Sequence, residues 1–90
     1  MILITGHVIL TPEHRERMIA LGAEHSARSR GEPGCLAHNC HIDVESPDRL
    51  MFVEEWESVD AVRAHFGLPA ARAFVADMRA LSPQPPAIRI

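Results

Sequence analysis

The sequence has no lysine, no tyrosine and only two cysteines among its 90 residues. Without lysine, Schiff-base and lysine-nucleophile chemistry is excluded, and the lack of tyrosine removes a common phenolic acid and radical carrier. Two cysteines are too few for a disulfide scaffold. Cys35 and Cys40 are expected on one strand, five residues apart, where they would point to opposite faces and could not bridge each other.

Long apolar runs and basic clusters are also missing. No run approaches the ~20 residues that a membrane-spanning helix needs. The hydrophobic segment 1–10 has no cationic start and no small-residue cleavage site, so we expect no signal peptide and a cytoplasmic protein. The nine arginines are dispersed and the net charge is −3. A nucleic-acid partner is therefore not expected.

Hydrophobic residues, by contrast, are abundant for so short a chain. Ninety residues predict a single domain over residues 1–90. A chain of this length buries only roughly 60% of its unfolded surface, yet 47% of its residues are hydrophobic. The excess suggests a second burial surface, most simply an identical partner. The alternative is an ordinary compact monomer.

Hydrophobic periodicity and turn residues predict six elements. Strands are predicted over 2–10, 35–44, 49–57 and 87–90. A first helix begins at Thr11-Pro12-Glu13 and runs to about residue 30, with Met18, Leu21, Gly22 and His25 on its inner face. A second helix is capped by Ser58, ends at Gly67 and continues from Pro69 to about residue 81. Its inner positions are predicted to be Val59, Val62, Phe66, Ala71, Phe74, Val75, Met78 and Leu81.

This order, β-α-β-β-α-β, predicts an α+β ferredoxin-like fold with helices on one face of an antiparallel sheet. The third strand carries apolar side chains at Met51 and Val53 as well as at Phe52 and Trp56, so both of its faces are expected to be buried. Helices would cover one face, and the sheet of a partner subunit would cover the other. Gly6 leaves a gap on the inner face of the first strand, which a ligand, a bulge or a closely packed helix would explain.

Six histidines raise the question of a metal site. His38 and His41 would project to opposite faces of their strand and so cannot share an ion, while His38 and Cys40 supply only two ligands. We therefore predict no metal. The alternative places His14 and His25 on helix surfaces or edges, and makes the strand histidines polar members of half-buried strands.

His65, Trp56 and Glu54 are the candidate catalytic residues. His65 lies beside the apolar stripe of its helix, where it would be a general base or a hydrogen-bonded helix-end histidine. Trp56 would line an aromatic pocket, fill the core, or both. Glu54 shares the inner face with Trp56 and Phe52. An inward-facing carboxylate needs a partner, and it becomes an acid or base if its pKa is raised.

The chain resembles the antibiotic biosynthesis monooxygenase family. The resemblance covers residues 2–81 and is carried by Pro33-Gly34-Cys35-Leu36, by Glu54 two residues before Trp56, by Ala64-His65-Phe66 and by the helix from Pro69 through Phe74. It implies a dimeric α+β barrel with a cavity in each subunit between sheet and helices.

The resemblance also implies a reaction. Family members include cofactor-free oxygenases of polyphenolic intermediates, quinol monooxygenases and haem-degrading enzymes. It implies a homodimeric, cofactor-independent monooxygenase that uses dioxygen on a small aromatic quinol or phenol. His65 would be the base, with Trp56 and Glu54 as further catalytic residues. The substrate would be held by Gly6, His38, Asn39, Phe52, Phe66 and Phe74, although only one of the neighbours His38 and Asn39 can face the cavity.

Several positions depart from the family pattern. Phe52 replaces an asparagine of the polyketide oxygenases, and Val62 is nearest to their helical tyrosine. The haem-degrading members have an axial histidine near Val75 and an asparagine near Gly6, which argues against haem degradation here. Two other functions stay open: a module that binds a hydrophobic ligand without turnover, and a structural or regulatory dimer, which would have a cavity too small for a ring.

Overall fold

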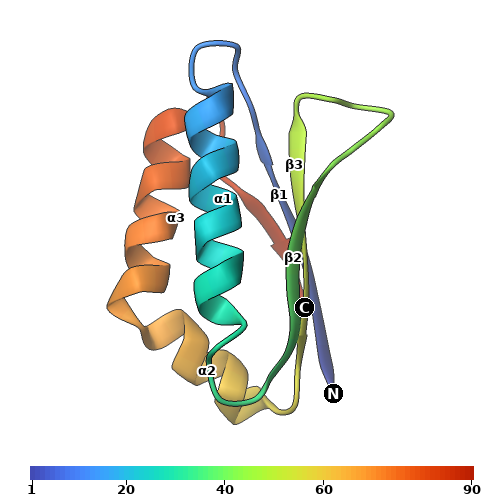
Figure 1. The fold of residues 1–90 in the computed structure, drawn as a ribbon, viewed down its shortest axis with the longest axis vertical. Helices are drawn as coiled ribbons and strands as arrows, with labels where there is room; N and C mark the ends of the chain where they lie inside the picture. Colours follow the sequence, from blue (N-terminus) through green and yellow to red (C-terminus); the bar gives the residue numbers. More distant parts are fainter.

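The computed structural model describes residues 1–90 as a four-stranded antiparallel sheet with three helices on one face (Figure 1). The elements are β1 (Ile2–Ile9), α1 (Arg15–Ser29), β2 (Cys35–Ile42), β3 (Arg49–Trp56), α2 (Val59–Gly67), α3 (Pro69–Leu81) and β4 (Ala87–Arg89). This order confirms the predicted ferredoxin-like fold, with the second helix divided in two. None of the helices combines the length and apolar character that crossing a bilayer requires.

The sheet places β1 and β3 at its centre, in the strand order β2-β3-β1-β4. β1 pairs with β3 along its full length, from Ile2 opposite Trp56 to Ile9 opposite Arg49. β4 pairs with β1 only at residues 5–7. Side chains alternate between the two faces of a strand, so this register puts Phe52, Glu54 and Trp56 together on the face that the helices cover.

The first helix begins later than predicted. The backbone N–H of His14 donates to the backbone oxygen of Thr11 at 3.2 Å and to its Oγ1 at 3.3 Å. Thr11 therefore closes a turn, and α1 starts at Arg15 rather than at Pro12. The predicted inner face holds, because Met18, Gly22 and His25 are buried. Gly22 lets α1 approach the sheet closely: a Cβ there would lie 3.1 Å from the Leu50 side chain.

A bulge in β2 corrects the prediction for the two cysteines. Cys35 pairs with Trp56, but Ala37 pairs with Glu55, so Leu36 is the extra residue. One extra residue reverses the alternation of side chains. Cys35 and Cys40 consequently face the helices together, packed against different core clusters, and both are free thiols.

The interior is divided into two apolar clusters. The larger contains Val8, Leu10, Met18, Leu50, Phe52, Phe74 and Met78. The smaller contains Ile4, Trp56 and Val62. Along β3, Glu54 separates Phe52 of the larger cluster from Trp56 of the smaller one. Six buried polar residues thus occupy the interior beside these clusters: His25, Ser26, Ser29, His38, Glu54 and His65.

The α2 helix begins as predicted, because the Ser58 side chain accepts a hydrogen bond from the N–H of Ala61 at 3.2 Å. Its predicted inner stripe is only partly correct. Val62 is buried and Phe66 is half-buried, but Val59 is 50% exposed at the first helical position. The second face of the sheet carries no helix, and it leaves the apolar side chains of Leu3 and Val53 exposed.

Candidate functional site

A cavity of about 230 Å³ lies between the sheet and the helices. Its wall includes residues of all three helices and of strands β1, β3 and β4: Gly6, His7, His25, Phe52, Glu54, His65, Phe66, Ala71, Phe74, Val75, Met78, Arg79, Pro86, Ala87 and Ile88. An apolar cavity of roughly 150 Å³ can already hold benzene. The cavity is therefore large enough for one substituted aromatic ring, contrary to what a purely structural dimer predicts.

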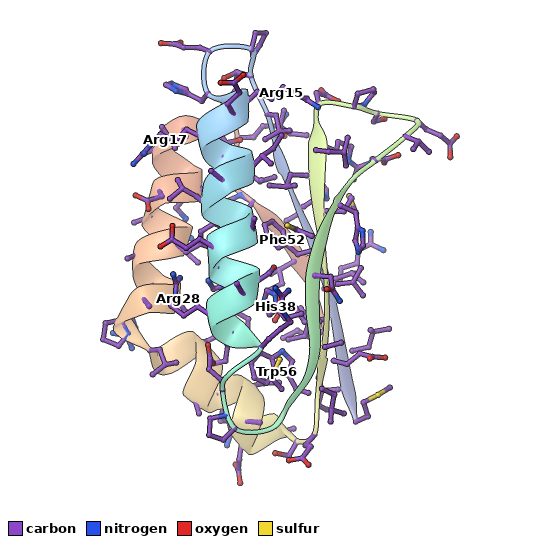
Figure 2. All side chains as sticks on the ribbon, in the orientation of Figure 1. Arg15, Arg17, Arg28, His38, Phe52 and Trp56 are labelled. Carbon is purple, nitrogen blue, oxygen red and sulfur yellow. The ribbon has the colours of Figure 1, made fainter.

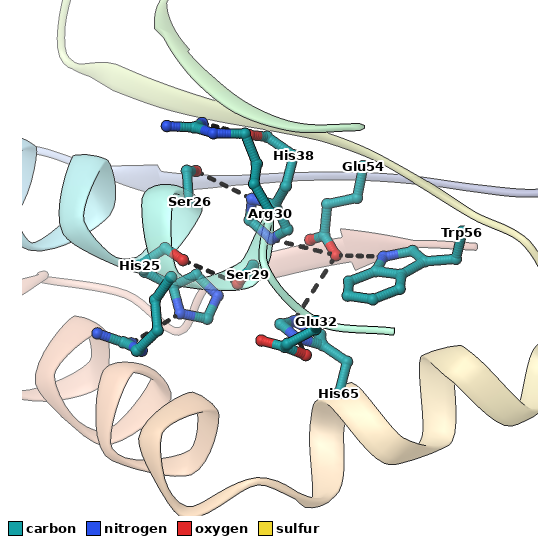
Figure 3. A network of polar contacts seen from close by, with 10 residues as sticks. His25, Ser26, Ser29, Arg30, Glu32, His38, Glu54, Trp56 and His65 are labelled. Carbon is teal, nitrogen blue, oxygen red and sulfur yellow. Dashed lines mark hydrogen bonds and ion pairs between the residues drawn. The ribbon is translucent and has the colours of Figure 1, made fainter. Parts of the chain in front are cut away.

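Glu54 is the polar centre of this region. Its Oε1 atom accepts a hydrogen bond from the indole Nε1 of Trp56 at 2.9 Å. The same oxygen lies 3.4 Å from His38 Nε2 and 3.8 Å from His65 Nε2 (Figure 3). Burial by itself raises the pKa of the Glu54 carboxyl, but the contacts with His38, Trp56 and His65 outweigh it and hold the pKa below its ordinary value. Glu54 is thus an anion at neutral pH.

His65 is held by a second carboxylate. The helix α2 brings this side chain inward, where it is 2% exposed. Its Nδ1 lies 2.8 Å from Oε1 of Glu32, which belongs to the turn between α1 and β2. A carboxylate accepts from Nδ1–H, and this leaves the Nε2 of a neutral His65 with a free lone pair. That nitrogen lies toward Glu54, which also lines the cavity.

His38 projects from β2 under α1 and has no exposed surface (Figure 2). Its Nδ1 is 2.9 Å from Ser26 Oγ, and its backbone oxygen accepts a hydrogen bond from Arg30 Nη1 at 2.8 Å. Its Nε2 has Glu54 nearby, but outside hydrogen-bond geometry, and so has no hydrogen-bond partner. A buried ring nitrogen without a hydrogen bond is costly, so it invites a functional explanation.

His25 completes a triangle of imidazoles. Its ring stacks on Phe74 with centroids 4.2 Å apart, and its Nδ1 accepts from Arg28 Nη2 at 3.1 Å. Burial first, and then the charges of His38, His65 and Arg28, lower the pKa of His25 from 6.5 to about 3. His25 is therefore neutral at physiological pH. It is also 6% exposed, which agrees with the predicted inner face of the helix and rules out the alternative placement on a helix surface or edge.

The structure brings together most of the residues predicted from the sequence. Gly6, Phe52, Glu54, His65, Phe66 and Phe74 all line the cavity. Trp56 does not: it is fully buried in the smaller core cluster, where its ring packs against His65 with centroids 4.6 Å apart. Trp56 therefore contacts Glu54 and His65 from the core and positions them without lining the cavity.

The neighbours His38 and Asn39 take opposite sides of the sheet, as expected. His38 pairs with Glu54 on the inner face, whereas Asn39 pairs with the exposed Val53 on the outer face. Asn39 is itself exposed and does not reach the cavity, so it is removed from the substrate-binding set. His41 lies on the outer face as well, and this confirms that His38 and His41 cannot share an ion.

Four residues of the site were missed by sequence reasoning: Glu32, His25, Ser26 and Ser29. Glu32 stands in a turn beside Pro33 and Gly34, where an acidic residue is ordinarily solvated. Ser26 and Ser29 lie one and four positions after His25 on α1, and Ser29 Oγ donates to the His25 backbone oxygen at 2.8 Å. The small residues Ser26 and Ser29 were the available sign that the site lies beside this end of α1, because small side chains let His38 of the sheet approach the helix.

Comparisons with known proteins agree with this fold. The family model described as antibiotic biosynthesis monooxygenase matches residues 1–77. A protein of Synechocystis without a characterised function is 30% identical over 89 residues. The alignment covers 99% of this chain, and the chain spans 60% of the length of that relative.

Solved structures show the same architecture. A crystal structure of an antibiotic biosynthesis monooxygenase superposes with a TM-score of 0.89 at 25% identity, covering 99% of this chain and 94% of that one. A Deinococcus radiodurans protein gives 0.95 at 22% identity, covering 99% and 88%. Rv0793 of Mycobacterium tuberculosis gives 0.89 at 22% identity, covering 97% and 88%. The last two likenesses concern the fold alone.

Proposed function

Because the chain belongs to the antibiotic biosynthesis monooxygenase family, we propose that it is a monooxygenase of a small aromatic quinol or phenol that needs no resident cofactor. The Glu32–His65 pair beside the cavity carries this proposal. A carboxylate that fixes one ring nitrogen of a histidine and leaves the other free is the arrangement of a general base.

The reaction balances without an added reductant. A phenol with a hydrogen on the ring carbon that is attacked loses that hydrogen and its hydroxyl hydrogen. One atom of dioxygen becomes the new carbonyl oxygen of a quinone, and the other leaves as water. The substrate supplies all the electrons, so the protein must bind the ring, remove the first proton and exclude bulk water.

His65 would take that proton on Nε2. The imidazolium that forms would lie between two carboxylates, with Glu32 at 2.8 Å from Nδ1 and Glu54 at 3.8 Å from Nε2. Both carboxylates carry a charge opposite to that of the imidazolium, so they would stabilise the charge that develops as the proton is transferred. Trp56 would support the arrangement by donating to Glu54. His38 would contribute through its contact with the same Glu54 oxygen rather than by touching the substrate.

The aromatic ring would bind between Phe52, Phe66 and Phe74, three cavity-lining side chains. Aromatic faces and edges bind a flat ring without using polar groups. Gly6 adds only backbone to the wall, and its missing Cβ lets β4 approach β1 closely, since a Cβ there would lie 2.8 Å from the Ala87 backbone oxygen. Ile88, which pairs with Gly6, adds an apolar side chain to the wall beside it.

An oxygen electrode tests the proposal directly. Purified protein in chelated, metal-free buffer should consume dioxygen in the presence of a panel of quinols and phenols, with one quinone formed per dioxygen. His65→Gln should lower kcat about 10²-fold, while the matched change His14→Gln, in the turn before α1 and away from the cavity wall, should leave it unaltered. Saturable quinol binding without oxygen uptake would contradict the oxygenase and identify a binding module instead.

We propose further that two copies pair through the uncovered face of the sheet. Leu3 and Val53 are 50% and 37% exposed there, and Met51 and Ile9 are half-buried on the same face. An apolar sheet face without a cover ordinarily marks an interface. Sedimentation equilibrium should show a dimer at micromolar concentration.

Two valine substitutions test whether dimerisation depends on this face rather than on another part of the surface. Val53→Glu should convert the dimer to a monomer by placing a charge in the interface. Val44→Glu, in the β2–β3 connection where Val44 is 91% exposed, should leave the dimer intact. A monomeric wild type, or equal behaviour of the two variants, would overturn this part of the proposal.

A further inference from the structure

Three histidines from three different elements meet beside the cavity. His25 comes from α1, His38 from β2 and His65 from α2, and all three are buried. Their ring centroids are separated by 5.1, 5.4 and 5.6 Å. One ligand nitrogen of each ring lies within 4.8 Å of those of the other two. Burying three imidazoles at such close range is unusual unless they share a task.

Each ring is oriented through its Nδ1 atom. His65 Nδ1 meets Glu32 at 2.8 Å, His38 Nδ1 meets Ser26 at 2.9 Å, and His25 Nδ1 meets Arg28 at 3.1 Å. None of the three Nε2 atoms makes a hydrogen bond, but those of His38 and His65 lie at ion-pair distance from Glu54 Oε1, as the dashed lines of Figure 3 mark. The Nε2 of His38 is wholly buried and makes no hydrogen bond, with Glu54 Oε1 3.4 Å away. In metal-binding histidines the nitrogen that does not bind the ion characteristically donates to a polar acceptor. Glu32 and Ser26 can accept from His65 and His38 in this way, whereas Arg28 donates to His25.

We propose that His25, His38 and His65 form a binding site for a borderline divalent ion such as Zn²⁺ or Co²⁺. Imidazole nitrogens suit these ions, and three histidines are the protein ligands of an open tetrahedral site. The fourth position would be completed by the carboxylate of Glu54 or by a molecule from the cavity. Glu54 adds a compensating negative charge, with Oε1 at 3.4 and 3.8 Å from two of the three Nε2 atoms.

Two adjustments accompany binding. Metal–nitrogen bonds of ~2.0–2.1 Å set the ligand nitrogens roughly 3.3 Å apart, so the three rings must move toward one another. Arg28 must also release His25, because a guanidinium only donates, and its hydrogen bond to Nδ1 leaves the hydrogen of a neutral ring on Nε2. Arg28 is exposed and lies 3.6 Å from Glu24, to which it can turn.

Metal binding and the proposed oxygenase activity would exclude each other. The ion would occupy the Nε2 lone pair with which His65 is proposed to remove the substrate proton. Inhibition by metal therefore rests on the proposed function, whereas metal binding itself does not. A protein that binds Zn²⁺ but never consumes oxygen would contradict the oxygenase alone.

Isothermal titration of tag-free, chelator-treated protein with ZnCl₂ tests the site. We expect one ion per chain and a dissociation constant below about 10 μM. Excess metal should raise the Tm by roughly 5 °C. Co²⁺ should give the intense visible absorption of a tetrahedral complex. Binding weaker than about 1 mM, or an octahedral Co²⁺ spectrum, would overturn the proposal.

Variants locate the ion within the chain. His25→Gln and His38→Gln should each weaken binding at least 10-fold, and far-ultraviolet circular dichroism with thermal melts shows whether they fold. His14→Gln, in the turn before α1 and outside the histidine cluster, should bind like wild type. Cys35→Ser with Cys40→Ser should do the same. Retained affinity in both histidine variants, or its loss in the cysteine variant, would refute the site.

Arg28→Ala offers a test that a merely structural role would not predict. It removes the donor that competes for His25 but touches none of the proposed ligands. Zn²⁺ affinity should rise several-fold in this variant. Unchanged or lower affinity would show that His25 is not a ligand, since no other contact links Arg28 to the ion.

Discussion

His65 and Glu32 stand 33 positions apart in the chain, yet the Nδ1 of one lies 2.8 Å from Oε1 of the other. The pair joins α2 to the turn that follows α1. Glu54 and Trp56 of β3 contact the same imidazole, with Glu54 Oε1 3.8 Å from Nε2 and the indole centroid 4.6 Å from that of the ring. His65 is consequently held between two carboxylates and an indole, with a defined tautomer.

Glu32→Gln should separate two roles of Glu32, orienting the His65 ring and neutralising its positive charge. A carboxamide oxygen can still accept from Nδ1–H, but it cannot neutralise an imidazolium. We expect kcat with a quinol to fall roughly 10²-fold, with little change in KM. Oxygen uptake under single-turnover conditions measures this. Glu57→Gln, an exposed acid in the loop before α2, is the control, and a similar loss in both variants would contradict the role of Glu32.

The stability of the metal-free protein should fall in acid because of His25. Its pKa is about 3 in the folded protein and 6.5 in the unfolded chain, so the unfolded state takes up a proton first as the pH decreases. This contribution is complete above pH 6.5 and is lost between pH 6.5 and 3. By pH 4.5 the resulting loss in the free energy of unfolding amounts to about 2–3 kcal/mol.

Urea denaturation across this pH range measures that slope. His25→Gln has no such proton and should show a flatter profile of unfolding free energy against pH than the wild type. Parallel profiles for wild type and His25→Gln would show that burial does not lower the pKa of His25.

Trp56→Phe should expose the dependence of Glu54 on its indole donor. The change keeps most of the buried ring but removes the 2.9 Å hydrogen bond to Oε1. Leaving a buried carboxylate short of one donor should cost about 1–3 kcal/mol. Repeating the substitution in a Glu54→Gln background forms a double-mutant cycle. A coupling energy near zero would mean that the loss comes from packing alone.

Two glycines provide a matched pair for the wall of the cavity. A Cβ at Gly6 would lie 2.8 Å from the backbone oxygen of Ala87, so Gly6→Ala should push β4 away and destabilise the protein by about 1–3 kcal/mol. A Cβ at Gly67 would meet nothing within 4 Å, so Gly67→Ala should be neutral or slightly stabilising. Thermal melts compare them, and amide exchange at Ile88 should accelerate only in Gly6→Ala. Equal behaviour of the two variants would contradict a close fit between β1 and β4.

Local patterns were sufficient for the strands and for most helix positions. Alternation along β3 placed Phe52, Glu54 and Trp56 on one face, and the capping role of Ser58 followed from its side chain. These pattern rules failed where a single residue shifted the alternation of a strand or the start of a helix. The bulge at Leu36 turned Cys35 to the inner face, and the turn at Thr11 delayed α1 until Arg15. Neither event changes the hydrophobic pattern enough to be seen in it.

The sequence by itself determined the element order, the inner face of the sheet and the family, because these depend on periodicity and on short motifs. Only the tertiary structure decided that His25, His38 and His65 share one site. Sequence reasoning tested histidines that lie near one another in the chain, and it correctly separated His38 from His41. Packing of α1 and α2 against β2 and β3 set the remaining distances. Such distances follow from how elements dock in space, which no local pattern specifies.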